Sequence, residues 1–83
     1  MKIDSKELAV LCCFRGTRMS IRTLRILLGK QEDDVEEIET VLAQLIVLGL
    51  VEKQGTAYQK TDEGHRFLYN ITNGYPQFLW NWD

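Results

Sequence analysis

Apolar residues along this chain recur at the spacings that distinguish helices from strands. In the middle of the sequence, Leu42, Leu45 and Leu48 lie three residues apart, which places them on one face of a helix. Gly49 follows, and glycine readily adopts the left-handed conformation at which helices end. Leu50 then begins a short apolar run. The pattern therefore predicts an amphipathic helix that ends at Gly49 and leads directly into a strand.

This central helix is expected to have one apolar and one polar side. Either Asp33 or Asp34 can cap its start, since an aspartate side chain accepts hydrogen bonds from the first backbone N–H groups of a helix. The side chains expected to face the core are Val35, Ile38, Leu42, Leu45 and Leu48. Those expected to face outward are Glu36, Glu37, Glu39, Thr40, Ala43, Gln44 and Val47. The outer side therefore carries three glutamates.

A first helix is predicted near the N-terminus. Asp4 and Glu7 form a capping-box pattern for it, and it is expected to run to about residue 15. Its apolar side chains point in nearly every direction, whereas a surface helix needs only one apolar stripe. We therefore expect it to be covered on more than one side, with Val10 and Phe14 meeting either the C-terminal tail or a second subunit.

Two more helices and a hairpin complete the predicted elements. Ser20 is placed to cap a second helix over residues 21–28. After the central helix, residues 50–53 and 57–60 can pair across a tight turn that contains a glycine. Thr61 is then placed to cap a closing helix.

The order of motifs in this half of the chain is more specific than any single motif. The motifs are Leu45-x-x-x-Gly49-Leu50-Val51, Gly55, Tyr58, Thr61-Asp62-Glu63-Gly64 and Phe67-Leu68. Together they are similar to the helix, wing and closing helix of many small prokaryotic winged helix-turn-helix regulators, and the similarity extends over residues 4–71. The resemblance implies an α+β, mainly helical winged-helix domain over residues 1–72. It also implies a DNA-binding transcriptional regulator that forms a homodimer.

Residues 73–83 form an aromatic C-terminal tail. Phe78, Trp80 and Trp82 alternate there, as they would along an extended strand. Large aromatic side chains bury much apolar area and favour interfaces, so we expect the tail to pack on its own domain or on a second subunit. The candidates for an oligomer interface are Val10, Phe14, Phe78, Trp80 and Trp82.

The composition limits the chain to one small domain. Its 83 residues, 45% of them hydrophobic, suffice for a single core. No apolar run approaches the roughly 20 residues that cross a bilayer, and the start of the chain lacks a signal-peptide pattern, so we expect a cytoplasmic protein without membrane contact. The adjacent Cys12 and Cys13 are expected to be buried, reduced thiols. No catalytic grouping or metal-ligand cluster is visible, so neither an enzyme nor a cofactor is expected.

The formal net charge of -2 conceals a separation of charge along the chain. From residue 8 to residue 30 every charged side chain is basic: Arg15, Arg18, Arg22, Arg25 and Lys30. The stretch that follows is acidic, with Glu32, Asp33, Asp34, Glu36, Glu37 and Glu39. Internal ion pairs, association between copies and a basic face for nucleic acid would all produce such a separation, and the pattern leaves all three open.

Two kinds of binding function fit these residues. The first is binding of double-stranded DNA, with Arg15, Arg18, Arg22, Arg25, Thr40, Gln44, Lys53 and Lys60 as candidate contacts. The second is a protein–protein interaction module, in which Glu36, Glu37 and Glu39 bind a basic protein partner. Glutamates on the outer side of the third helix oppose contact with phosphates, which favours the second function. The family resemblance places the first function ahead.

Overall fold

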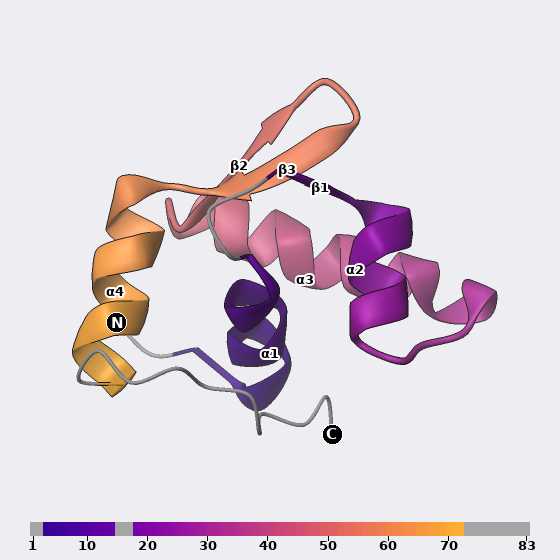
Figure 1. The fold of residues 1–83 in the computed structure, drawn as a ribbon, viewed down its shortest axis with the longest axis horizontal. Coiled ribbons are helices and arrows are strands. Elements are labelled where there is room, and N and C mark those ends of the chain that lie inside the picture. Colours follow the sequence, from indigo (N-terminus) through magenta and orange to yellow (C-terminus); the bar gives the residue numbers. More distant parts are fainter. Residues whose placement is uncertain (1–2, 15–17, 73–83) are drawn as a thin grey trace.

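Four α-helices, a short 3-10 helix and a three-stranded antiparallel sheet make up the described part of the chain (Figure 1). The structure is a computed structural model that describes residues 3–14 and 18–72. Arg15 and the tail residues Phe78, Trp80 and Trp82 lie outside the described residues. In chain order the elements are α1 (Ser5–Cys13), β1 (Met19–Ser20), α2 (Ile21–Leu27), η1 (Glu32–Asp34), α3 (Val35–Val47), β2 (Val51–Gln54), β3 (Ala57–Lys60) and α4 (Asp62–Thr72). This is a small, mostly helical α+β fold, and its arrangement is compatible with a winged helix.

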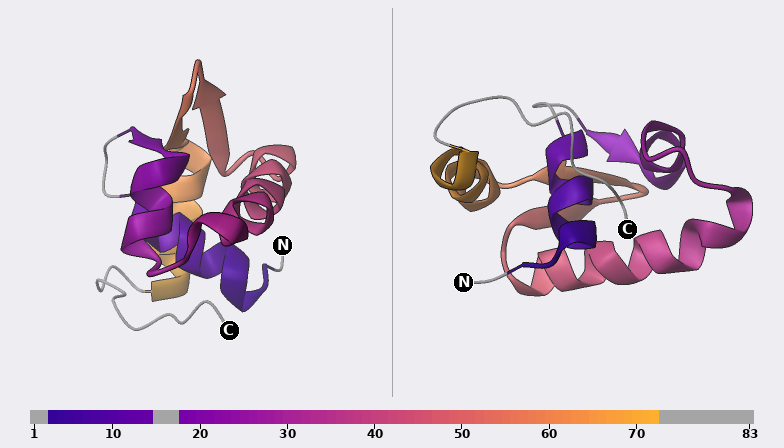
Figure 2. Two further views of the ribbon diagram at one scale, coloured as in Figure 1. Left: turned by 90° about the vertical axis from the view of Figure 1, so that its right-hand side faces the viewer. Right: turned by 90° about the horizontal axis from the view of Figure 1, so that it is seen from below.

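α1 lies at the centre of the domain, between α4 on one side and α2 on the other, with α3 packed against it (Figure 1, Figure 2). Its start has the expected capping box. The Asp4 carboxylate accepts from the Glu7 N–H (2.8 Å), and the Glu7 carboxylate accepts from the Asp4 N–H (2.9 Å). The helix ends at Cys13, earlier than expected, because Phe14 has an extended backbone (φ -80°, ψ 117°).

The apolar side chains of α1 are buried on several sides at once. Leu8, Ala9, Val10 and Leu11 are consecutive and all buried, as the all-round apolar pattern requires. Val10 is 0% and Phe14 2% exposed, and both belong to one core cluster with residues of α2, α3 and the sheet. Their expected place in an oligomer interface is therefore corrected, because packing within the chain already removes both side chains from the surface.

α3 packs against the core along the face that the sequence predicts. Ile38, Val41, Leu42 and Leu45 are buried, whereas Val47 is 80% exposed. Val41 was missing from the expected set, although it lies three residues after Ile38 and four before Leu45. The buried face therefore follows helical spacing throughout.

The start of α3 differs from the expectation of an aspartate cap. A 3-10 turn, η1, precedes the helix, and the Asp34 carboxylate accepts from the Gln31 N–H at the start of that turn (3.0 Å). Asp34 makes no side-chain bond to the first turn of α3. The aspartate therefore caps the turn that leads into the helix.

The sheet contains a strand that the sequence pattern did not predict. Its strand order is β1-β3-β2, and both pairings are antiparallel. Met19 of β1 and Lys53 of β2 both lie opposite Tyr58 of the central strand. β1 spans only two residues, which is too short to show an alternating pattern. Because Ser20 ends β1 and also caps α2, this strand joins the start of α2 to the hairpin.

The end of α3 and the start of α4 meet at one backbone junction. Gly49 has a φ of 78°, which ends α3. The Thr61 N–H donates to the Leu50 carbonyl (3.0 Å), and the Thr61 hydroxyl donates to the Gly49 carbonyl (2.6 Å). The same hydroxyl oxygen accepts from the Gly64 N–H (3.0 Å) and so caps α4. Gly64 lies so close that a Cβ there would overlap the Leu50 carbonyl oxygen and lie 2.9 Å from the Lys60 Cγ.

Replacing Gly64 with alanine should destabilise the domain, although alanine is ordinarily the better helix former. Its methyl group would overlap the Leu50 carbonyl, and relieving overlap in a packed region costs about 1–3 kcal/mol. We expect urea unfolding to show a loss of this size. The control is Asn70→Ala on the exposed side of α4, which should change stability by less than about 0.5 kcal/mol. A Gly64→Ala protein as stable as the wild type would contradict the close approach.

Candidate functional site

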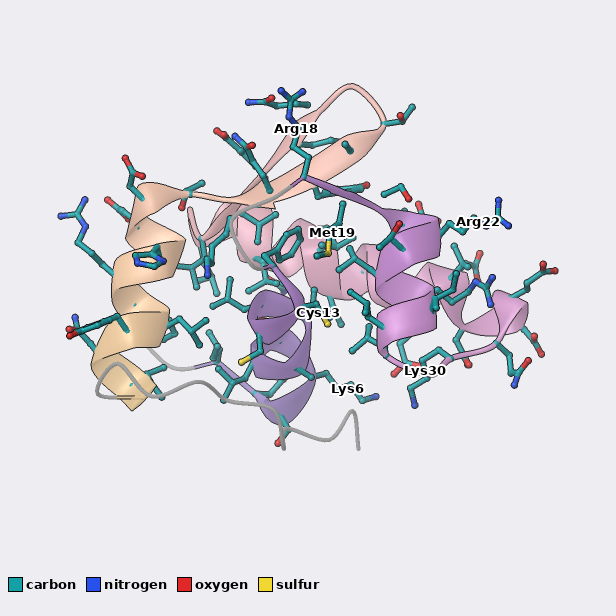
Figure 3. The ribbon with its side chains drawn as sticks, in the orientation of Figure 1. Lys6, Cys13, Arg18, Met19, Arg22 and Lys30 are labelled. Atoms are coloured by element: carbon teal, nitrogen blue, oxygen red, sulfur yellow. The ribbon has the colours of Figure 1, made fainter. Side chains whose placement is uncertain are left out.

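Among the described arginines of the basic stretch, Arg18 and Arg22 are exposed (Figure 3). Arg18 precedes β1 and lies beside the hairpin, whereas Arg22 is in the first turn of α2 and points away from it. The local structure that places them is the Ser20 cap, whose hydroxyl oxygen accepts from the Thr23 N–H (3.2 Å). Neither arginine forms an ion pair within the described residues. Both guanidinium groups are therefore available to a partner.

Arg25 and Lys53 are less available than the exposed arginines. The Arg25 side chain is partly buried, and its Nη1 donates to the Lys30 carbonyl (3.2 Å), which closes the turn after α2. Lys53 is exposed on β2, with its ammonium 5.6 Å from the centre of the Tyr58 ring. The ring attracts the cation but leaves its outer side open to solvent.

Lys60 is directed toward the interior of the domain. Its Nζ donates to the carbonyl of Phe14 at the end of α1 (3.1 Å), and burial lowers the pKa of Lys60. Lys60 lies two residues after the buried Tyr58, so strand alternation places both on the core-facing side of β3. This position contradicts the expectation that Lys60 contacts DNA, and the alternation was the sequence signal for it.

The exposed side of α3 is acidic near the start of the helix and apolar near its end. Glu36, Thr40, Ala43 and Val47 follow helical spacing and are all exposed, as are Glu39 and Gln44 on either side of them. The Thr40 hydroxyl donates to the Glu36 carbonyl (2.9 Å), so its proton is used within the helix. Among the expected DNA contacts on α3, Gln44 therefore remains as an available side-chain donor.

Glu37 lies on the side of α3 that faces α1. It forms an ion pair with Lys6 of α1, and each side chain is less than half exposed (41% for Glu37 and 43% for Lys6). The sequence pattern did not indicate this pair, because nothing local links residues 31 positions apart. The acidic side chains that face solvent on α3 are thus Glu36 and Glu39, which we call the acidic pair.

Opposite charges on α2 and α3 do not neutralise each other within the domain. The two helices pack together, yet within the described residues no ion pair joins an arginine to α3. Of the three explanations for the charge separation, internal pairing of the arginines with α3 is therefore excluded for the described residues. Association between copies and a basic face for nucleic acid both remain.

Two apolar side chains of α2 are exposed, and neither was among the expected contact residues. Ile26 is 60% and Leu27 55% exposed. The available signal was that Ile21, Leu24 and Leu28 already fill the inward face at helical spacing, which leaves positions 26 and 27 outside.

The two cysteines lie in surroundings that suppress thiol chemistry. Burial, with a smaller contribution from the neighbouring Cys13, raises the pKa of Cys12 from 9.0 to about 11, against a lowering effect of Lys60. The Cys13 thiol donates to the Ala9 carbonyl (3.3 Å). A reactive or redox-sensing cysteine requires a low pKa, so Cys12 does not fit that role.

Known proteins provide no relative from which a function could be transferred. No protein-family model, no curated protein and no solved structure significantly matches this chain. Within residues 3–14 and 18–72, no helix has the length and apolar content of a membrane span. In the same residues, no group of three or more His, Cys, Asp or Glu side chains could hold a metal ion. The function is therefore inferred from the charged and apolar surfaces themselves.

The raised pKa of Cys12 predicts slow alkylation in the folded protein. At pH 8 a shift from 9.0 to about 11 lowers the thiolate fraction by about 100-fold. A Cys13→Ser variant loses the smaller Cys13 contribution but keeps the burial, so iodoacetamide should modify its Cys12 more slowly in the native state than in urea, by up to about 100-fold. Equal rates would contradict the burial of this thiol.

The same shift gives a pH dependence of stability. Because the folded pKa lies above the unfolded one, the neutral Cys12 thiol stabilises the fold fully below pH 9.0, and this contribution is lost as the pH rises toward 11. The difference in melting temperature between wild type and Cys12→Ala should accordingly shrink over that interval. A difference in melting temperature that stays constant from pH 8 to pH 11 would contradict the raised pKa of Cys12.

Proposed function

We propose that this chain is a non-catalytic winged-helix domain that binds double-stranded DNA and regulates transcription. The observation that carries the proposal is that Arg18, beside the hairpin, and Arg22, in the first turn of α2, are both exposed and form no ion pair within the described residues. The order of elements supports the fold: three helices precede a hairpin, and β1 adds the third strand of the sheet. Winged helix-turn-helix regulators have this arrangement.

Phosphate groups are the expected partners of the exposed arginines. A guanidinium presents its N–H donors in a planar fork that fits phosphate oxygens. Lys53 on the neighbouring hairpin adds a third exposed cation. Because β1 pairs with β3, and β3 pairs with β2, the sheet holds Arg18 and Lys53 in a fixed relation to the start of α2.

α3 is expected to contribute little affinity. The acidic pair repels phosphates, and Gln44 is the exposed amide that can pair with an adenine edge. Contacts to phosphate position a protein on DNA without reading sequence. We therefore expect DNA binding to be salt-dependent and only weakly selective for sequence.

A protein partner is the second candidate, and the exposed side of α3 favours it. The acidic pair is solvent-facing, and Val47 at the other end of the helix is 80% exposed. A basic segment with an apolar residue about two to three helical turns away would match this face. In that case the winged helix would act as an interaction module for a basic protein.

Salt dependence tests the DNA proposal most directly. Removing one phosphate contact reduces the slope of log K against log salt by about 0.9. Arg18→Gln with Arg22→Gln should therefore weaken duplex binding and reduce that slope by about 2. The matched control is Arg66→Gln on the exposed side of α4, which removes an arginine charge far from the proposed contact and should leave the slope unchanged.

The acidic pair provides the complementary measurement. Glu36→Gln with Glu39→Gln removes repulsion, so duplex binding should be equal or tighter. Duplex binding that stays undetectable at low salt, both in the wild type and in this variant, would end the DNA proposal. The protein-interaction module would then take its place.

A further inference from the structure

The exposed face of α2 is cationic at its start and apolar at its end. Arg22 lies in the first turn, and Ile26 and Leu27 follow one turn later with 60% and 55% of their surface exposed. We call these three residues the α2 face. Large apolar side chains beside an unpaired charge are typical of a contact surface rather than of a solvated helix.

The exposed face of α3 has the same order with the opposite charge. The acidic pair, Glu36 and Glu39, lies near the start of the helix, and Ile46 and Val47 at its end are 38% and 80% exposed. We call these four residues the α3 face. The α2 face therefore presents a positive charge, the α3 face presents negative charges, and both have an exposed apolar end.

The α2 face and the α3 face of the same chain cannot contact each other. α2 and α3 pack through their buried sides, which carry Leu24 on α2 and Ile38 on α3. Their exposed sides consequently point away from the shared core. Arg22 is accordingly without an ion pair among the described residues, and so is the acidic pair.

We propose that the α2 face of one copy docks on the α3 face of a second copy, and that the contact is reciprocal in a twofold dimer. With the two helices side by side, pointing in the same direction and with their apolar ends aligned, Arg22 extends toward Glu39, the nearer member of the acidic pair of the second copy. Ile26 and Leu27 then lie toward Ile46 and Val47 of that copy. Opposite charges fix the register, and the apolar ends remove their surface from water.

The dimensions of the two faces agree with this contact. At 1.5 Å per residue, Arg22 and Leu27 are separated by about 7.5 Å along α2. Along α3, Val47 is about 12 Å from Glu39 and about 16.5 Å from Glu36, so Glu39 is the carboxylate within reach of Arg22. The long arginine side chain covers the difference. A twofold axis forms the contact twice, because each copy contributes both faces.

A second copy is the occupant that fits the α3 face best. This face needs a partner that is cationic at one end and apolar at the other, in a fixed direction. α2 of the same chain has both features in that direction, and every molecule in solution carries it. A basic peptide from another protein would have to supply the same combination.

The dimer has a regulatory consequence that rests on the proposed function. It covers Arg22, one of the arginines expected to contact phosphate. The acidic pair of one copy then competes with DNA for the arginine of the other. Docking itself does not depend on DNA binding, so the two can be tested apart.

Charge exchange between the faces tests the docking. Arg22→Glu alone, and Glu36→Arg with Glu39→Arg, each place like charges against each other in the homodimer. Each variant should raise the dimer dissociation constant at least about tenfold in sedimentation equilibrium. An equimolar mixture of the two variants should restore dimers, because both contacts are again between opposite charges. The control is Arg66→Glu on α4, which should leave dimerisation unchanged.

Several results would overturn the docking. One is a wild type that stays monomeric at about 1 mM protein in low salt. Another is a charge-reversal variant that dimerises as tightly as the wild type. An equimolar mixture of the two variants that stays monomeric, or a wild type that forms open-ended chains instead of dimers, would also overturn it. Restoration in the mixture, with no DNA binding by any variant, would support the docking and end the DNA proposal.

Val47→Ser tests the competition without altering any charge. Where the wild type is dimeric, this variant should dissociate and bind duplex DNA more tightly. The matched control is Ile71→Ser on α4, a residue that is 43% exposed and lies outside both faces. Unchanged dimerisation of Val47→Ser would overturn the apolar half of the contact, and unchanged DNA affinity of a dissociated variant would overturn the competition.

Discussion

The close approach of Gly64 to the Leu50 carbonyl is the constraint on which the arrangement of the hairpin depends. The chain leaves α3 at Gly49 and returns to the same point after the hairpin. There the Thr61 N–H donates to the Leu50 carbonyl and the Thr61 hydroxyl donates to the Gly49 carbonyl. The hairpin is therefore anchored at its base by the hydrogen bonds of Thr61, and a Cβ at position 64 would overlap the Leu50 carbonyl oxygen that accepts one of them. With the base fixed, strand alternation directs Tyr58 into the core and Lys60 toward the end of α1.

The elements that the sequence predicted correctly are those with local signals. The four helices and the hairpin lie within two residues of their expected positions, because caps, glycine ends and helical spacing are all properties of neighbouring residues. β1 was not predictable in this way, since a two-residue strand is defined only by its pairing with β3. The 3-10 turn before α3 likewise replaced a simple aspartate cap.

The candidate site was predictable in part, and the misses have physical causes. The exposure of Arg18, Arg22 and the acidic pair agrees with the expected surface. The direction of Lys60 could have been read from its distance to Tyr58, but the pairing of Glu37 with Lys6 depends on how α1 and α3 pack. An all-round apolar helix indicates that it must be covered, without indicating that its own chain does so. The partner of the charged surfaces likewise cannot be identified from one chain alone. The sequence shows only which charges and apolar groups a partner would have to complement.

The strand order β1-β3-β2 also bears on how the protein avoids aggregation. The hairpin strand β3 is central, with strands on both sides, so the outer edges of the sheet belong to β1 and β2. β1 offers only two residues to an incoming strand. β2 offers four, and the charged Glu52 and Lys53 occupy its middle. Short or charged edges make poor templates for another chain. The two residues of β1 pair with Ala57 and Tyr58, and thus close half of the four-residue β3 edge against strand addition.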